Sequence, residues 1–212
     1  MTAASSRFRT TFQVRLVDGK KIEVIEGDRH PWHFRVHYHL GNELAHITKG
    51  RARLRLASGS TDVEAGDTVL IPAGTLHRFE PLDVEGWAFR SEFHLGAEII
   101  WDEVGGPIVE RVTNQLSARH TLQTDLASVA AGCAVSAGHL ARIFRSDVGT
   151  SVHNFHVLLA IHKAKTLLKE QSPVVDAALD AGFFDQAHFT REFVRMAGLT
   201  PGLFRHAWAT VS

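Results

Sequence analysis

Residues 181–193, AGFFDQAHFTREF, determine the predicted fold of the C-terminal half, because a similar stretch occurs at residues 131–144, AGCAVSAGHLARIF. In both stretches Ala-Gly precedes a His, a Phe follows that His by five residues, and a Gly follows the Phe by five more. A short helix, a turn that contains Gly and a second helix that ends at Gly is typical of a helix-turn-helix. The sequence therefore predicts two such units, in an all-α half.

The stretch between the two units has the pattern of one amphipathic helix, 151–170. Twenty helical residues span about 30 Å, and successive major grooves on one face of B-DNA lie about 34 Å apart. The predicted rod is therefore long enough to hold two recognition helices in adjacent grooves. Its predicted core-facing residues are Phe155, Leu158, Ile161, Ala164 and Leu168.

Helical spacing divides each predicted second helix into a core face and an outward face. Leu140, Ile143 and Phe144 are expected to be buried, as are Phe189 and Phe193. Arg can contact a guanine edge with two hydrogen bonds and Gln an adenine edge, so Arg191 and Gln186 are predicted to read bases. The alternative is that these polar residues are solvated on ordinary helical hairpins. The full set of predicted DNA-binding residues is Gly138, Ala141, Arg142, Arg145, Gln186, Ala187, His188, Thr190 and Arg191.

The N-terminal half has the patterns of β-strands. Charged and apolar residues alternate from Arg51 to Leu56, which is the period of a strand with one wet face and one buried face. Many short strands separated by Gly and Pro favour a barrel or a sandwich. Further predicted strands are Phe12–Val17, Ile22–Ile25, Phe34–His39, Thr68–Ile71 and Gly86–Phe93.

The strand pattern ends at Val104-Gly105-Gly106-Pro107, and helical spacing follows. This break predicts a β domain over residues 1–104, a linker over 105–111 and a helical domain over 112–212. Residues 1–106 hold 13 basic and 15 acidic side chains, and residues 107–212 hold 10 and 8. The slight positive excess in the second part is weakly in favour of DNA binding.

Four residues of the β-rich part have the chemistry of metal ligands. In a strand, residues two apart point to the same face, so His37 and His39 are expected to point together into the barrel. Glu43, after a predicted Gly-Asn turn, and His77, on a separate predicted strand, complete a set of three imidazoles and one carboxylate. Such a set suits Zn, Mn, Fe or Ni better than Ca.

Other features narrow the class of protein. The single cysteine, Cys133, excludes an internal disulfide and is expected to be a buried apolar side chain. The sequence shows no signal peptide and no apolar run of membrane-spanning length, so a cytoplasmic protein without membrane contact is expected.

Residues 122–206 resemble the DNA-binding domain of the AraC/XylS family of transcription regulators. The resemblance is carried by 139–144 with Gly149, by 164–168, and above all by 181–193 with 198–201. It implies double-stranded DNA as partner, a homodimer, and base contacts from the outward residues given above. Gly138 and Ala141 have no hydrogen-bonding side chain, and Ala160 stands where the family usually has Arg, so both features depart from the pattern.

Residues 30–82 resemble the two cupin motifs. His37, His39, Glu43 and Gly50 match HxH(x)3E(x)6G, and Gly66, Pro72, Gly74 and His77 match G(x)5PxGxxH. Pro31 and Pro81 depart from the motifs. The combined resemblance implies an N-terminal jelly-roll cupin that senses an effector, either a small molecule or a divalent metal, and modulates operator binding. The alternative is a metal-dependent, dioxygenase-like cupin enzyme fused to a DNA-binding domain.

Overall fold

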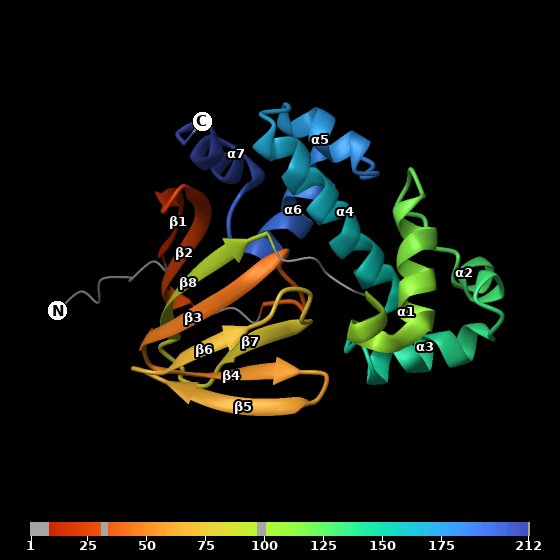
Figure 1. The fold of residues 1–212 in the computed structure, drawn as a ribbon, viewed down its shortest axis with the longest axis horizontal. Helices are drawn as coiled ribbons and strands as arrows, with labels where there is room; N and C mark the ends of the chain where they lie inside the picture. The colour runs from red at the N-terminus through yellow and green to blue at the C-terminus, as the bar shows by residue number, and fades with distance from the viewer. Residues whose placement is uncertain (1–8, 31–33, 97–100, 212) are drawn as a thin grey trace.

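The computed structural model describes residues 9–30, 34–96 and 101–211, apart from the side chains of residues 29, 30 and 101–105. In this part of the chain, β-strands come first and helices follow (Figure 1). The strands are β1 (Arg9–Val17), β2 (Lys20–His30), β3 (Gly41–Lys49), β4 (Arg51–Leu56), β5 (Gly59–Glu64), β6 (Thr68–Ile71), β7 (His77–Pro81) and β8 (Trp87–Leu95).

The strands form two antiparallel sheets. One has the order β1-β2-β8-β3-β6 and the other has the order β5-β4-β7. Along β4, Ala52 and Leu54 are buried while Arg51 and Arg55 are exposed, which confirms the predicted alternation. The inner faces of the sheets share an aromatic core in which Trp87 stacks on Phe89 with ring centroids 4.5 Å apart.

The predicted strand over Phe34–His39 is wrong. This segment is extended but forms only an isolated bridge, in which His37 and His77 exchange two backbone hydrogen bonds of 2.9 Å. The predicted Gly-Asn turn before Glu43 is also wrong, because Gly41 and Asn42 begin β3. A Cβ on Gly41 would lie 2.4 Å from the carbonyl oxygen of His94, so Gly allows a close approach to β8.

Seven helices follow the strands in the described residues. They are α1 (Trp101–Ser117), α2 (Leu126–Gly132), α3 (Ala137–Ser146), α4 (Val152–Lys169), α5 (Val174–Asp180), α6 (Gln186–Ala197) and α7 (Pro201–Ala209). The predicted linker, 105–111, lies inside α1, where Gly106 has a φ of +75° and Pro107 follows it. The segment is therefore helical, although Gly and Pro interrupt its regularity. The division into domains remains a prediction.

Local sequence explains where the C-terminal helices begin. Ser136, Ser151, Asp185 and Thr200 each accept a hydrogen bond from a backbone N–H in the first turn of α3, α4, α6 and α7, respectively. Gly198 ends α6 in the left-handed conformation, with a φ of +71°. The five apolar residues predicted to face the core from α4 are all buried, as are Phe189 and Phe193 of α6.

No single helix of the described residues combines the length and the apolar character that a membrane crossing requires. The bent pair of α2 and α3, which meet at 90°, satisfies both criteria only when its helices are taken together.

The barrel and the helices are in direct contact. Helices α6 and α7 lie against the barrel, whereas α2 and α3 lie at the far end of α4 (Figure 1). The rings of Phe12 in β1 and Phe204 in α7 stack with centroids 5.2 Å apart. Glu23 in β2 accepts a hydrogen bond of 3.1 Å from Trp208 and pairs with Lys169 at 2.8 Å. The two halves therefore share a buried interface.

Candidate functional site

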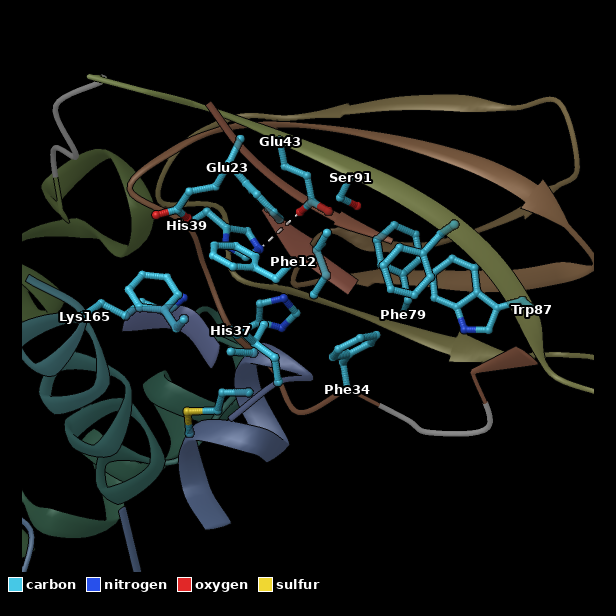
Figure 2. Close-up of a pocket in the computed structure, with 17 residues that line it drawn as sticks. Phe12, Glu23, Phe34, His37, His39, Glu43, Phe79, Trp87, Ser91 and Lys165 are labelled. Carbon is cyan, nitrogen blue, oxygen red and sulfur yellow. Dashed lines mark ion pairs between the residues drawn. The ribbon is translucent and has the colours of Figure 1, made fainter. Parts of the chain in front are cut away.

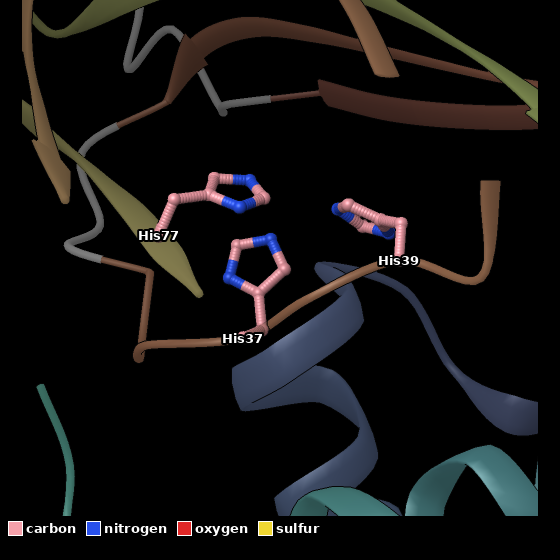
Figure 3. Close-up of side chains that lie close together, drawn as sticks. All are labelled: His37, His39 and His77. Carbon is pink, nitrogen blue, oxygen red and sulfur yellow. The ribbon is translucent and has the colours of Figure 1, made fainter. Parts of the chain in front are cut away.

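Three histidine side chains from two segments converge inside the barrel (Figure 3). His37 and His39 come from the extended segment before β3, and His77 is the first residue of β7. One nitrogen from each ring lies within 4.8 Å of the others. Glu43 in β3 places Oε2 3.2 Å from Nε2 of His39 and 3.0 Å from Nε2 of His77. The structure thus brings the four predicted ligands together.

Backbone carbonyl groups fix which nitrogen of two rings faces the cluster. Nδ1 of His37 donates to the carbonyl of Arg35 at 2.8 Å, and Nδ1 of His77 donates to the carbonyl of Thr75 at 2.9 Å. In the neutral ring, Nε2 of each histidine then offers a lone pair. Such backbone bonds to the outer nitrogen are the usual support of a metal-binding histidine.

The cluster contains acceptors that face each other. Nε2 of His77 and Oε2 of Glu43 are both buried, and neither has a hydrogen-bond partner among the described residues. Two buried acceptors 3.0 Å apart are unfavourable unless a cation or a proton lies near them. A divalent transition metal fits this donor set.

The ionisation of the cluster also suits a metal. Burial holds the pKa of His37 well below its usual value, and the neighbouring His77 and His39 lower it further. Burial likewise lowers the pKa of His39, although Glu43 opposes the effect. Burial alone would raise the pKa of Glu43, but the imidazoles of His39 and His77 bring it well below its usual value. Neutral imidazoles beside a carboxylate are the protonation states that bind metal.

A cavity between the barrel and the helices opens onto this cluster. Figure 2 shows Lys165 of α4 at the helical end of the cavity and Phe79 and Trp87 at the opposite end. Met196 and Phe204 line it from α6 and α7. The free volume is about 40 Å³, which is room for about three water molecules. Only a small ligand fits without movement of the walls.

Lys165 gives the cavity a cationic wall. Its ammonium nitrogen lies 5.9 Å and 5.7 Å from the ring centroids of Phe193 and Phe204. Burial lowers the pKa of Lys165, and Glu23 opposes the effect. Among the described residues, no carboxylate lies within ion-pair distance of it. Neither Lys165 nor Glu23 was predicted as part of the site, because no spacing rule links a helix residue to a distant barrel.

The DNA-binding candidates of α3 lie at or near the surface. Gly138, Arg142 and Arg145 are exposed, and Ala141 is half-buried. Leu140 and Phe144 are fully buried on the opposite side of the helix, whereas Ile143, which was predicted to be buried, is half-buried. Among the candidates of α3, the exposed side chains that can donate hydrogen bonds are therefore those of Arg142 and Arg145.

The candidates of α6 divide into two groups. Gln186, Ala187 and Arg191 are exposed, whereas His188 and Thr190 are half-buried. The ring of His188 packs edge-on against Phe183 with centroids 5.3 Å apart. Among these candidates of α6, the exposed side chains that can form hydrogen bonds are therefore those of Gln186 and Arg191.

Each half of the chain matches a known domain family. Residues 129–207 match a helix-turn-helix domain family, and residues 21–83 match a cupin domain family. The arabinose operon regulatory protein of Salmonella typhimurium is 35% identical over 82 residues, which are 38% of this chain and 29% of that protein. The HTH-type transcriptional regulator MtrA of Neisseria gonorrhoeae is 36% identical over 72 residues, 34% of this chain and 24% of MtrA. The chain thus spans less than a third of these relatives.

One solved structure resembles nearly the whole chain in fold. The structure of an apo ToxT variant from Vibrio cholerae superposes with a TM-score of 0.54 at 11% identity, covering 95% of this chain and 97% of ToxT. At that identity the likeness concerns the fold alone.

The fold and the matches define a class of protein in which a β-rich cupin domain precedes a helical helix-turn-helix domain. Residues 129–207 match the helix-turn-helix domain family and residues 21–83 match the cupin domain family, so the predicted resemblance to AraC/XylS regulators with an N-terminal cupin is confirmed. The Pro31 departure from the cupin motif lies outside the described residues.

Proposed function

We propose that this chain is a sequence-specific DNA-binding transcription regulator whose cupin domain adjusts its affinity for an operator. The observation that carries the proposal is the exposed face of α6. Asp185 caps the helix, Phe189 and Phe193 are buried, and Gln186 and Arg191 remain exposed in its N-terminal half. The N-terminal residues of a recognition helix are the ones that reach base edges in the major groove.

The arrangement of helices favours two reading units. We assign α2 with α3 to one helix-turn-helix and α5 with α6 to the other, with α4 as the linker helix between them. Helix α4 has 18 residues and so spans about 27 Å. That length is of the order of the roughly 34 Å between successive major grooves on one face of B-DNA. Dimerisation would add a second pair of units and remains a prediction.

The cupin domain is the proposed sensor. His37, His39, Glu43 and His77 would hold a divalent transition metal, Zn, Ni, Mn or Fe, which would act there as a charged effector. The small free volume favours a metal with its waters, or a small anion beside Lys165, over a bulky organic effector.

A second function is a metal-dependent, dioxygenase-like enzyme, and the same ligand set is the observation that favours it. The tight cavity and the regulators among the relatives argue for sensing instead. Oxygen uptake by the metal-loaded chain, measured with a panel of small substrates, separates the two functions. Sustained turnover would support the enzyme, and its absence across the panel supports the sensor.

One experiment tests the proposed DNA-binding helices and the proposed cupin sensor together. Duplex DNA is selected from a random pool by the untagged chain, once with Zn²⁺ and once with a chelator. Enrichment of one sequence motif is expected, with tighter or weaker binding of that motif when Zn²⁺ is present. A pool without enrichment in either condition would overturn the DNA-binding proposal.

The metal has its own test. Elemental analysis of the chain purified without an affinity tag is expected to find one transition metal per chain, or to find it after metal addition and gel filtration. The variant Glu43→Gln should lose it, because the amide lacks the negative charge. Equal metal retention by both proteins would show that the metal lies elsewhere.

A further inference from the structure

The segment that carries His37 and His39 is bonded to both halves of the molecule. His37 pairs with His77, and the N–H of Gly74 donates to the carbonyl of His39 at 3.0 Å, so the outer residues are tied to the barrel. The residue between them, Tyr38, has a different partner. Its carbonyl oxygen lies 3.1 Å from Nε2 of His162 in α4. The backbone between two candidate ligands is therefore tied to the helical half.

The contact between Tyr38 and His162 is directed and buried. Their rings stack with centroids 4.2 Å apart at 27°, and the residues are only 3% and 8% exposed. A carbonyl oxygen only accepts, so Nε2 of His162 carries the hydrogen. Nδ1 of His162 then keeps a lone pair that has no hydrogen-bond partner among the described residues. The hydrogen bond to the carbonyl of Tyr38 and the stacking against the Tyr38 ring hold the imidazole of His162 in place.

A second tie leads from the same segment to α6. The carbonyl of Arg35 accepts from Nδ1 of His37, and the guanidinium of Arg35 pairs with Glu192 at 2.9 Å. Glu192 lies in α6, one residue after Arg191. The candidate ligands are thus connected to α4 through Tyr38 and to α6 through Arg35.

We infer that His162 is a positioning residue that couples occupancy of the His37–His39 site to the position of α4, and through α4 to the fit of α3 and α6 on DNA. When Nε2 of His37 and His39 converge on an ion, Tyr38 between them must shift, and the hydrogen bond carries the shift to α4. The inference rests on the proposed function. Coupling of this kind is reciprocal, so DNA must change the metal affinity by the same factor as metal changes the DNA affinity.

The test measures that factor in both directions. Zn²⁺ affinity of the untagged chain is determined by competition with a chromophoric chelator, with and without the selected duplex, and duplex affinity is determined with and without Zn²⁺. A factor of about 5 to 150 is expected, equal in the two directions. His162→Phe keeps a stacking ring and removes the N–H donor. Its Zn²⁺ affinity without DNA should stay close to that of the unmodified chain, while the coupling factor falls towards one.

Two further variants separate coupling from folding. His162→Gln restores an N–H donor and should regain part of the coupling, and it carries the test if His162→Phe does not fold. His153→Phe, at an exposed position of the same helix, should leave the coupling unchanged. Wild-type coupling in His162→Phe, or independent binding of Zn²⁺ and DNA by the unmodified chain, would overturn this inference alone. DNA binding without any Zn²⁺ binding would overturn the metal proposal as well.

Discussion

His156 in α4 is a buried histidine outside the cluster of His37, His39 and His77. It is 3% exposed, and its Nδ1 lies 2.9 Å from the hydroxyl of Thr124. Burial lowers its pKa to about 4, and the charges of Arg119 and His153 add to the effect. The unfolded chain, with an ordinary histidine pKa, binds more protons than the folded chain between these two values. The neutral, buried His156 therefore contributes fully to stability at neutral pH. This contribution is lost as the pH falls from the ordinary histidine pKa to the lowered pKa of His156.

For the metal-free chain we therefore expect the free energy of unfolding to decrease from pH 7 to pH 5. His156 should account for about 1 kcal/mol of this change, since nearby polar groups weaken the full linkage effect. Urea unfolding of His156→Gln at several pH values should give a flatter dependence. His206→Gln, at an exposed position of α7, serves as control, and an unchanged slope in His156→Gln would contradict the assignment.

Arg191 and Arg142 are the residues on which DNA reading depends in the proposal. Each Arg→Ala change should cost about 1 to 3 kcal/mol of binding to the selected duplex if the side chain makes a bidentate base contact. Fluorescence anisotropy measures the change, and Arg111→Ala, at an exposed position of α1, is the matched control. Equal binding by all three variants would refute the groove assignment.

The elements of the molecule differ in how well their sequences predict them. Helices α3 and α6 follow from N-terminal caps and apolar spacing, and α6 also from its terminal Gly198, all of which act within one element. Strand β5 escaped prediction because five of its six residues are exposed, so it carries little apolar pattern. The segment Phe34–His39 has a strand pattern, yet its only backbone bridge is to His77, some forty residues away. Strand pairing depends on distant partners, which periodicity does not report.

The N-terminal cap of α6 allows a test of what stabilises a single helix. Asp185 accepts a hydrogen bond of 2.6 Å from the N–H of His188. Asp185→Ala should lower the free energy of unfolding by about 1 kcal/mol, and Asp185→Asn should remain close to the unmodified chain because it keeps a capping acceptor. Urea denaturation followed by circular dichroism measures both. If Asp185→Ala had the same free energy of unfolding as the unmodified chain, the cap would contribute nothing to stability.

For the molecule as a whole, the interface between the barrel and the helices could not be predicted from the sequence. The candidate ligand histidines were found because motif spacing brings them together, whereas Lys165 and Glu23 line the cavity, and His162 contacts Tyr38, only through tertiary packing. Their roles depend on how α4 and α7 dock, and that docking leaves no periodic signal in the chain.

The Glu23 contact predicts how the two halves unfold. Glu23 is 7% exposed and binds both Trp208 and Lys169, so Glu23→Ala removes a hydrogen bond of the buried Trp208 indole and an ion pair of the half-buried Lys169. We expect a loss of about 2 kcal/mol and a change from one calorimetric transition towards two. Asp62→Ala, which breaks an exposed ion pair with Arg53, should have no measurable effect. A single unshifted transition in Glu23→Ala would argue against a stabilising interface.

The shared cavity has a consequence for biosynthesis. Its barrel wall is translated first, and Phe204, which lines it from α7, is translated more than a hundred residues after the last strand, β8. Since domains generally fold in the order of their synthesis, the nascent barrel presents the histidine cluster on an open side until α7 docks. Metal loading during translation would then be easier than exchange in the finished chain, and the metal content would record the conditions under which each molecule was made.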